Sequence, residues 1–253
     1  IKCLDRKIAL NRALNHNLEA MAKQLYDYWF VQFDFPNAEG KPYKSSGGKM
    51  VWNAKLKHYI PEGWEVIPIF EEFDILYGYP FSTDSFTEEA TSVPVVRIRD
   101  IIDGTISAYT TEITDSKYQL SEGDLVIGMD GNFHMNIWAD RTAYLNQRCV
   151  RIRKKNIVLP HQALYALHPY IKAKEASAKG STVGHLSDKD MKELTVIKAS
   201  AELQPAFNSQ IEPLTKHIIR NRQEVLNLVK LRDELLPLLM NGQVSVNYDL
   251  AHD

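Results

Sequence analysis

Two long stretches with apolar residues at alternating spacings of four and three enclose a middle segment of different periodicity. Neither Pro nor Gly occurs from residue 4 to residue 30, a length that would form a helix of ~40 Å. The spacing predicts a spacer helix over residues 1–35 with a coiled-coil seam. The seam positions are Leu4, Ile8, Asn11, Asn15, Leu18, Ala22, Leu25 and Trp29.

The second such stretch predicts a spacer helix over residues 201–243. Pro213 should kink this helix or start a second one, Pro237 should bend it locally, and Asn241-Gly242 should end it. An asparagine in each seam can fix the register of the two helices. An antiparallel pair is the economical arrangement. The seam positions are Leu214, Ile218, Asn221, Val225, Leu228, Arg232, Leu235 and Leu239.

Between the helices, short β-type runs alternate with turn residues over 61–200. We expect strands at 64–68, 94–99, 125–129 and 149–153, and a helix at 161–178. Asp103-Gly104 and Asp130-Gly131 are typical of tight hairpin turns. The chain is therefore expected to be an α+β protein, with one mixed domain flanked by two long helices in an antiparallel, coiled-coil-like pair. Residues 36–60 would form a linker loop and 244–253 a tail.

Composition limits the classes of function. The formal net charge is −2, so any binding of nucleic acid requires a local basic patch or a basic partner. Cys3 and Cys149 are the only cysteines, which argues against a disulfide framework or a zinc site and suits the cytoplasm. The sequence shows no membrane span and no signal peptide.

No catalytic motif stands out in the sequence. Phosphate-binding P-loop, dinucleotide-binding, zinc-protease and serine-hydrolase patterns are all missing. Acidic pairs such as Asp84/Glu88 or Asp124/Asp130 can be assembled into a metal site on paper, but 32 acidic residues produce such pairs by chance. We therefore expect a binding protein with no catalytic residues and no metal.

Two strands carry the same alternating pattern of valine or isoleucine with arginine. On each strand the arginines share one face, so four guanidinium groups would line one surface if both strands belong to one sheet. Arginine suits phosphate groups and guanine edges. An ordinary solvated sheet face remains the alternative. The arginines concerned are Arg97, Arg99, Arg151 and Arg153, with Arg148 nearby.

Two polar loops supply further candidate DNA-binding groups. Amides and imidazoles can bond base edges, and small residues allow the backbone to approach phosphate. Ordinary connecting loops are the alternative in both cases. The candidates are Asn132, His134, Asn146 and Gln147, and, in the small-residue loop, Lys179, Ser181, Thr182 and His185.

Aromatic residues gather at the end of the first predicted helix. Helices of ~40–50 Å would extend past a domain of this size, so part of their surface should be free for a protein partner. Packing within the chain is the alternative. The exposed apolar candidates are Tyr26, Trp29, Phe30 and Phe33.

These segments resemble the specificity subunits of type I restriction-modification enzymes. The run LNRALNHNLEAMAKQLYDYWFVQFDFP (10–36) resembles their central spacer helix, and LRDELLPLLMNGQV (231–244) the end of their C-terminal spacer. Between them, PVVRIRDI (94–101), GDLVIG (123–128), LNQR (145–148) and GSTVGHL (180–186) resemble landmarks of a target-recognition domain. The resemblance covers nearly the whole chain in the family's order.

The resemblance implies a division of labour among subunits. Such a chain would recognise one half of a split target in double-stranded DNA and would carry no cofactor. S-adenosylmethionine would be used by a methyltransferase subunit, and ATP by an endonuclease subunit. Full-length members hold two recognition domains, so we expect this chain to be the C-terminal half of a longer subunit or a half-subunit that self-associates.

Two other functions remain open from the residues themselves. An autonomous nuclease or methyltransferase subunit would need a metal or S-adenosylmethionine site. A coiled-coil adaptor would use the middle domain to bind protein and would show no DNA sequence preference.

Overall fold

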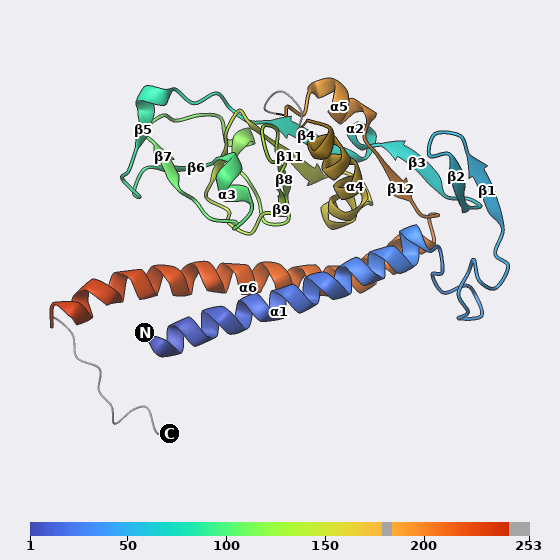
Figure 1. Ribbon diagram of the computed structural model, residues 1–253, viewed down its shortest axis with the longest axis horizontal. Helices are drawn as coiled ribbons and strands as arrows, with labels where there is room; N and C mark the ends of the chain where they lie inside the picture. Colours follow the sequence, from blue (N-terminus) through green and yellow to red (C-terminus); the bar gives the residue numbers. More distant parts are fainter. Residues whose placement is uncertain (179–183, 243–253) are drawn as a thin grey trace, which may run out of the picture.

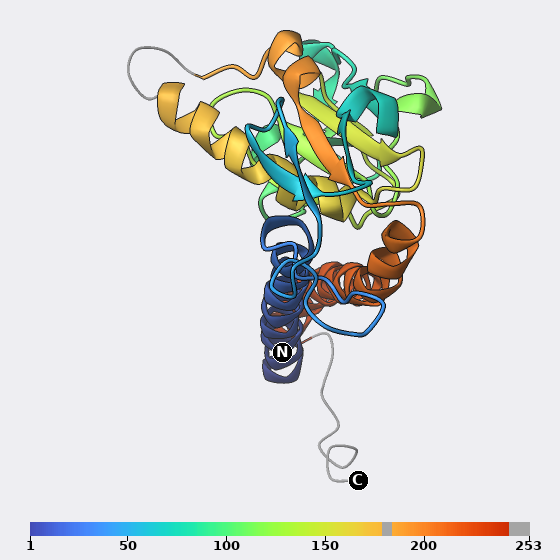
Figure 2. The ribbon, with the colours of Figure 1, turned by 90° about the vertical axis from the view of Figure 1, so that its right-hand side faces the viewer.

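Two long helices lie side by side beneath a β-rich domain (Figures 1 and 2). The computed structural model of the chain describes residues 1–178 and 184–242. The long helices are α1 (Lys2–Tyr26) and α6 (Leu203–Met240). The expected α+β architecture is confirmed. None of the helices in the described ranges has an apolar stretch long enough to cross a membrane.

The two long helices run antiparallel, as expected. Asp5 near the start of α1 accepts a hydrogen bond of 3.4 Å from Arg232 near the end of α6. Further along α1, Glu19 accepts one of 2.8 Å from Arg222. The contacts thus advance along one helix while they recede along the other. The predicted seam positions of both helices are buried or half-buried.

An asparagine pair fixes the register of the helices. Asn221 donates from its amide to Asn15 Oδ1 at 2.9 Å, and Asn15 donates to the carbonyl of Ile218 at 3.1 Å. Asn15 is buried, so a shift of one turn would leave its amide without these partners.

Helix α6 continues through Pro213 and Pro237, so of the two outcomes expected at Pro213, a kink or the start of a second helix, the second does not occur. Proline removes one backbone donor and its ring crowds the carbonyl four residues earlier, but tertiary packing can offset this cost. The helix ends at Asn241, and Gly242 adopts a positive φ of 66°, as expected for a helix stop.

The segment expected as a linker loop contains a β-hairpin. Strand β1 (Met50–Asn53) pairs antiparallel with β2 (His58–Pro61). A π-helix, Asp27–Val31, continues α1 before the chain enters this segment. The hairpin lies at one end of the molecule, on the right in Figure 1.

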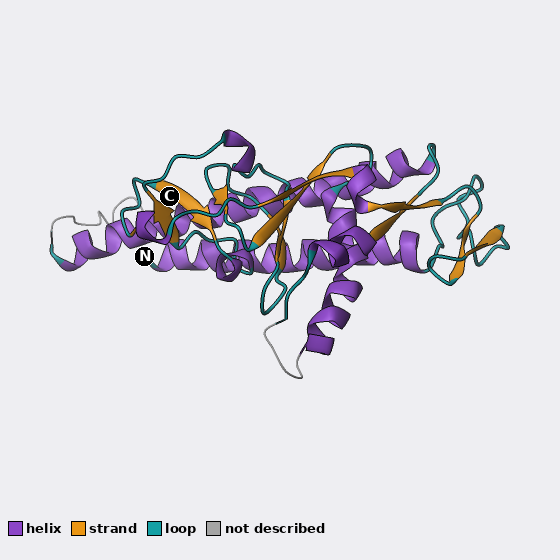
Figure 3. Ribbon diagram, turned by 90° about the horizontal axis from the view of Figure 1, so that it is seen from above, coloured by secondary structure: helices purple, strands orange, loops and turns teal. Residues whose placement is uncertain are grey.

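Two four-stranded sheets form the body of the domain, in the orders β4-β11-β8-β9 and β10-β6-β7-β5, and β12 pairs with β3. Figure 3 shows these strands along the length of the helix pair. The strands are β3 (Glu65–Pro68), β4 (Phe73–Tyr77), β5 (Phe86–Thr87), β6 (Val93–Val96), β7 (Ala108–Thr110), β8 (Leu125–Gly128), β9 (Met135–Ile137), β10 (Tyr144–Leu145), β11 (Cys149–Lys154) and β12 (Thr195–Lys198). The short helices are α2 (Ile69–Glu72), α3 (Ile98–Ile101), α4 (Pro160–Ala178) and α5 (Asp188–Glu193), with 3-10 turns at Thr83–Ser85 and Ser116–Tyr118.

The first of these sheets is covered on both faces. Leu125 and Ile127 of β8 pack in a cluster with Ala163 and Leu167 of α4. Val126, between them on the strand, points the other way into a cluster that includes Val96 of the second sheet. Alternate residues of one strand therefore fill two separate cores.

The aromatic residues at the end of α1 form a third core where the helix pair joins the domain. The expectation that Tyr26, Trp29, Phe30 and Phe33 are exposed for a partner is wrong, because all four are buried. The rings of Phe30 and Phe207 lie 4.8 Å apart, edge to face. Burying these large rings against the domain removes more apolar area from water than an exposed position would.

Replacing Asn15 with alanine is expected to lower the free energy of unfolding by about 1–3 kcal/mol, since it leaves the Asn221 amide without its partner. Urea unfolding measures the change. Asn17 is exposed on the same helix, so Asn17→Ala should change stability by less than about 0.5 kcal/mol. Equal effects of the two substitutions would contradict the proposed register contact.

His161 should make stability depend on pH. Burial, together with the charge of Arg222, lowers the pKa of His161 to about 3. An unfolded histidine takes up a proton below about pH 6.5, whereas the folded one does not, so stability falls as the pH drops from about 6.5 toward 3. We expect a contribution of about 2 kcal/mol to be lost between pH 7.5 and pH 5.

The measurement is urea unfolding of wild type and His161→Asn at both pH values. The variant should lose less stability on acidification than wild type does. His16 is exposed, so His16→Asn should keep the wild-type pH dependence. A His161→Asn variant with an unchanged pH dependence would rule out this account.

Candidate nucleic-acid interface

The strand expected at 94–99 ends early, and its two arginines lie at a short helix. β6 stops at Val96, and Arg97 is the N-cap of α3. The Asp100 carboxylate accepts a hydrogen bond of 2.9 Å from the backbone N–H of Arg97. This capping contact turns the chain into a helix, so the strand prediction is wrong beyond Val96.

The arginines at α3 converge on one serine. Arg97 Nη2 donates to the Ser107 carbonyl at 2.9 Å, and Arg99 Nε donates to Ser107 Oγ at 3.2 Å. Ser107 Oγ in turn donates to Asp100, which is buried. Burial raises the pKa of the Asp100 carboxyl. The cluster holds both guanidinium groups in place while Arg99 stays exposed.

One short helix and two loops surround an open hollow of about 430 Å³. The hollow brings together six of the predicted DNA-binding residues, although they lie far apart in the sequence. α3 contributes three lining residues, and the loops before β9 and β11 contribute two each. The lining residues are Arg97, Ile98, Arg99, Asn132, His134, Asn146 and Arg148.

Glycines allow these segments to approach closely. A Cβ on Gly128 of β8 would lie 2.9 Å from Ile98 Cγ2, so only glycine lets α3 sit against this strand. A Cβ on Gly78 would lie 1.9 Å from the carbonyl oxygen of Asn146. Gln147 is exposed beside Asn146 but does not line the hollow.

Asp130 connects two of the candidates and was not identified from the sequence. One of its oxygens lies 2.5 Å from His185 Nδ1, and the other lies 3.1 Å from Arg148 Nη1. His185 is thus held beside the hollow. The sequence indicated a tight turn and a chance acidic pair at Asp130 but not this contact, because a partner 55 residues away leaves no local signal. The remaining candidates, Lys179, Ser181 and Thr182, lie outside the described residues.

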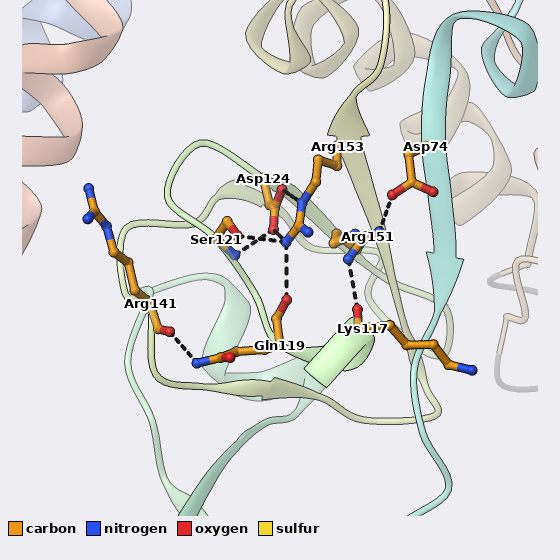
Figure 4. A network of polar contacts seen from close by, with 8 residues as sticks. All are labelled: Asp74, Lys117, Gln119, Ser121, Asp124, Arg141, Arg151 and Arg153. Carbon is orange, nitrogen blue, oxygen red and sulfur yellow. Dashed lines mark hydrogen bonds and ion pairs between the residues drawn. The ribbon is translucent and has the colours of Figure 1, made fainter. Parts of the chain in front are cut away.

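Arg151 and Arg153 instead form ion pairs and hydrogen bonds with other residues of the domain (Figure 4). The Arg151 side chain is only 4% exposed; it pairs with Asp74 and donates to the Lys117 carbonyl at 2.9 Å. Burial lowers the pKa of its guanidinium. Arg153 donates to both oxygens of Asp124 at 2.8 and 2.7 Å, and this hydrogen bonding raises the pKa of Arg153.

The predicted surface of four arginines is therefore wrong. The face of β11 that carries Arg151 is covered by the second core and by the segment around Lys117. Arg153 is half-buried in its contact with Asp124. Both guanidinium groups are paired with carboxylates of the domain itself.

The groups around the hollow suit recognition rather than bond breaking. Guanidinium groups donate hydrogen bonds to phosphate and guanine, and amides both donate and accept, as adenine requires. In the described ranges no three histidine, cysteine or acidic side chains lie close enough to hold a metal ion. The hollow is open and shallow, which fits contact with a large partner.

The protein-family model and the curated proteins that match this chain have the same kind of description. The model of the family described as the type I restriction modification DNA specificity domain matches residues 61–228, more than half of the chain. The MjaIX specificity subunit of Methanocaldococcus jannaschii is 26% identical over 96% of this chain and 56% of its own length. The EcoBI specificity subunit of Escherichia coli is 32% identical over 53% of this chain and 28% of its own length.

Solved structures share the fold. The HsdS subunit from Thermoanaerobacter tengcongensis matches with a TM-score of 0.50 at 13% identity, covering 96% of this chain and 55% of that one. The type I S subunit from M. genitalium matches with a TM-score of 0.50 at 18% identity, over 93% and 55% of the two chains. This chain spans about half the length of these relatives, which it matches over nearly all of its own length.

Replacing Arg151 with methionine is expected to lower the free energy of unfolding by about 1–3 kcal/mol, because the Lys117 carbonyl and the Asp74 carboxylate lose the donor that the buried Arg151 side chain supplies. Urea unfolding provides the measurement. Arg141, which is exposed, is the matched control, and Arg141→Met should cost less than about 1 kcal/mol. An Arg151→Met variant as stable as wild type would show that the contacts of Arg151 do not stabilise the fold.

Proposed function

The chain belongs to the type I restriction modification DNA specificity domain family, and from that premise we propose that it recognises a specific sequence in double-stranded DNA. The recognition surface consists of α3 and the loops before β9 and β11. One observation carries the proposal. Cationic and amide side chains from three separate segments converge on one open hollow.

The side chains around the hollow divide into two kinds of contact. Arg99 and Arg148 are exposed and carry the charge that positions phosphate groups. Asn132, Asn146 and His134 have the donors and acceptors that distinguish base edges in the major groove. Arg97 is held in place by Ser107, so its direction toward DNA is set before binding.

The electrostatic contribution of this chain to DNA binding is small. Its formal net charge is −2, and Asp130 offsets part of the charge of Arg148. Affinity for DNA depends strongly on the number of phosphates neutralised. Partner subunits therefore supply much of the affinity, while this chain supplies the sequence preference.

The relatives are named as specificity subunits of type I restriction enzymes. By that likeness, the chain directs catalysis without performing it, in the cytoplasm. A methyltransferase subunit that uses S-adenosylmethionine and an endonuclease subunit that uses ATP act at the site it recognises. The chain itself needs no cofactor. A second recognition unit, from the same polypeptide or from a second copy, reads the other half of the target.

The helix pair provides a spacer and a docking surface. Leu10, Leu14 and Met21 are exposed on α1 at spacings of four and seven, which places them on one face of the helix. That face points away from the buried seam residues Ile8 and Asn15. The methyltransferase subunit would cover this apolar stripe.

Sequence selection from a randomised DNA library, with the chain bound to its methyltransferase subunit, tests the proposal. A single enriched half-site is expected. Absence of any enriched sequence would favour a protein adaptor. DNA cleavage or methylation by the isolated chain would favour an autonomous enzyme.

Arg99→Gln is expected to weaken DNA binding about tenfold and to lower the salt dependence of binding by about one counterion, because one phosphate contact is lost. Asn132→Ala should instead change the enriched sequence. Fluorescence anisotropy at several salt concentrations measures the first effect. The exposed Arg141 lies outside the hollow, and Arg141→Gln should bind as wild type does.

A further inference from the structure

A second hollow, of about 800 Å³, lies beside the β1–β2 hairpin. We call it, together with the exposed face of the hairpin, the hairpin groove. Its apolar lining includes Val31, Met50, Leu56 and Ile197, together with the edges of the otherwise buried rings of Tyr26, Phe30 and Phe33. It shares no residue with the candidate DNA interface.

Large apolar side chains are exposed at the rim of the hairpin groove. Trp52 and Tyr59 lie opposite each other on the paired strands, with ring centroids 5.3 Å apart. They are 57% and 58% exposed. Val31 at the end of the π-helix is exposed as well and lines the hollow. Large apolar side chains exposed together in this way are typical of a binding site for another molecule.

The backbone beside the groove departs from regular α-helical geometry. The π-helix Asp27–Val31 follows directly on α1. Phe33 follows with a φ of 60°, a conformation that a bulky side chain rarely adopts. Such features concentrate at functional sites, where surrounding contacts hold them in place.

Positive charge predominates in the segment that carries the groove, although Lys41 and Lys49 are paired with Glu39 and Glu62. Residues 36–62 contain five lysines against two glutamates, whereas the whole chain has a net charge of −2. Lys44 lines the hollow itself. Lys55 and Lys57 in the hairpin turn make no ion pair with any part of the chain that the structure describes. An occupant with acidic groups around an apolar centre would complement this arrangement.

Apolar depth and basic rim together identify the kind of partner. A phosphate backbone would use the lysines but leave the apolar floor empty. A protein segment with apolar side chains and acidic flanks would use both. We propose that the hairpin groove binds such a segment of the methyltransferase subunit, as a contact separate from the α1 stripe. This inference rests on the proposed function, which supplies the partner.

Tryptophan is a specific probe for this contact. Of the four tryptophans, Trp29, Trp64 and Trp138 are buried and only Trp52 is exposed. The chain labelled with 5-fluorotryptophan therefore gives one ¹⁹F resonance open to solvent, which the Trp52→Phe variant assigns. Adding the unlabelled, purified methyltransferase subunit should shift this resonance and reduce its sensitivity to solvent.

Binding measurements test the energetic contribution. The double variant Trp52→Ser/Tyr59→Ser should bind the methyltransferase subunit at least about tenfold more weakly in calorimetry, because central aromatic contacts dominate interfaces. Lys55→Glu/Lys57→Glu should weaken binding too, and more strongly at low salt. Ile113 is 88% exposed and lies outside the groove, so Ile113→Ser is the matched control and should bind as wild type does.

The outcomes separate this proposal from the proposed function. A complex that forms while the Trp52 resonance stays unchanged, or that tolerates the double variant, overturns the hairpin groove contact alone. Protection of Trp52 by a DNA duplex and not by the methyltransferase subunit assigns the groove to DNA and also overturns it. No complex with the wild-type chain would overturn both proposals.

Discussion

The aromatic core at the end of α1 determines how the β-rich domain sits on the helix pair. Trp29 and Phe30 from the first helix, Phe207 from the last, and Trp64 from the domain meet there as closely packed rings. These residues come from both ends and the middle of the chain. Because closely packed rings resist displacement, this core holds the three parts in one relative position.

A polar contact further along the helices prevents rotation about that core. Arg222 on α6 donates to Glu19 of α1 and to the Ile137 carbonyl of β9. It also donates to Asn136, whose amide donates to the Ile101 carbonyl at the end of α3. The helix pair is therefore connected, contact by contact, to the helix that carries two arginines of the candidate DNA interface. A spacer can set the position of a recognition surface only if such a joint is stiff.

The candidate interface shows what periodicity predicts and what it does not. Alternation along 149–153 correctly placed Arg151 and Arg153 on one face of a strand, yet that face is covered by the second sheet. Arg97 and Arg148 reach the hollow through a cap and a loop, for which the sequence offered residue type but no direction. The aromatic residues at the end of α1 were expected to be exposed because an apolar stripe in a sequence does not indicate which residues cover it in the fold.

The sequence alone determined the helical spacers, their antiparallel seams, the family and the strands at 64–68, 125–129 and 149–153, since these depend on local periodicity and on residue order. The tertiary structure decided which polar groups are free, because that depends on contacts between residues far apart in the chain. Asp74 removes Arg151 from the surface, whereas Asp130 keeps Arg148 and His185 at its edge. Whether a guanidinium group neutralises an internal carboxylate or faces solvent is a property of its neighbours in space, and a one-dimensional pattern contains no record of them.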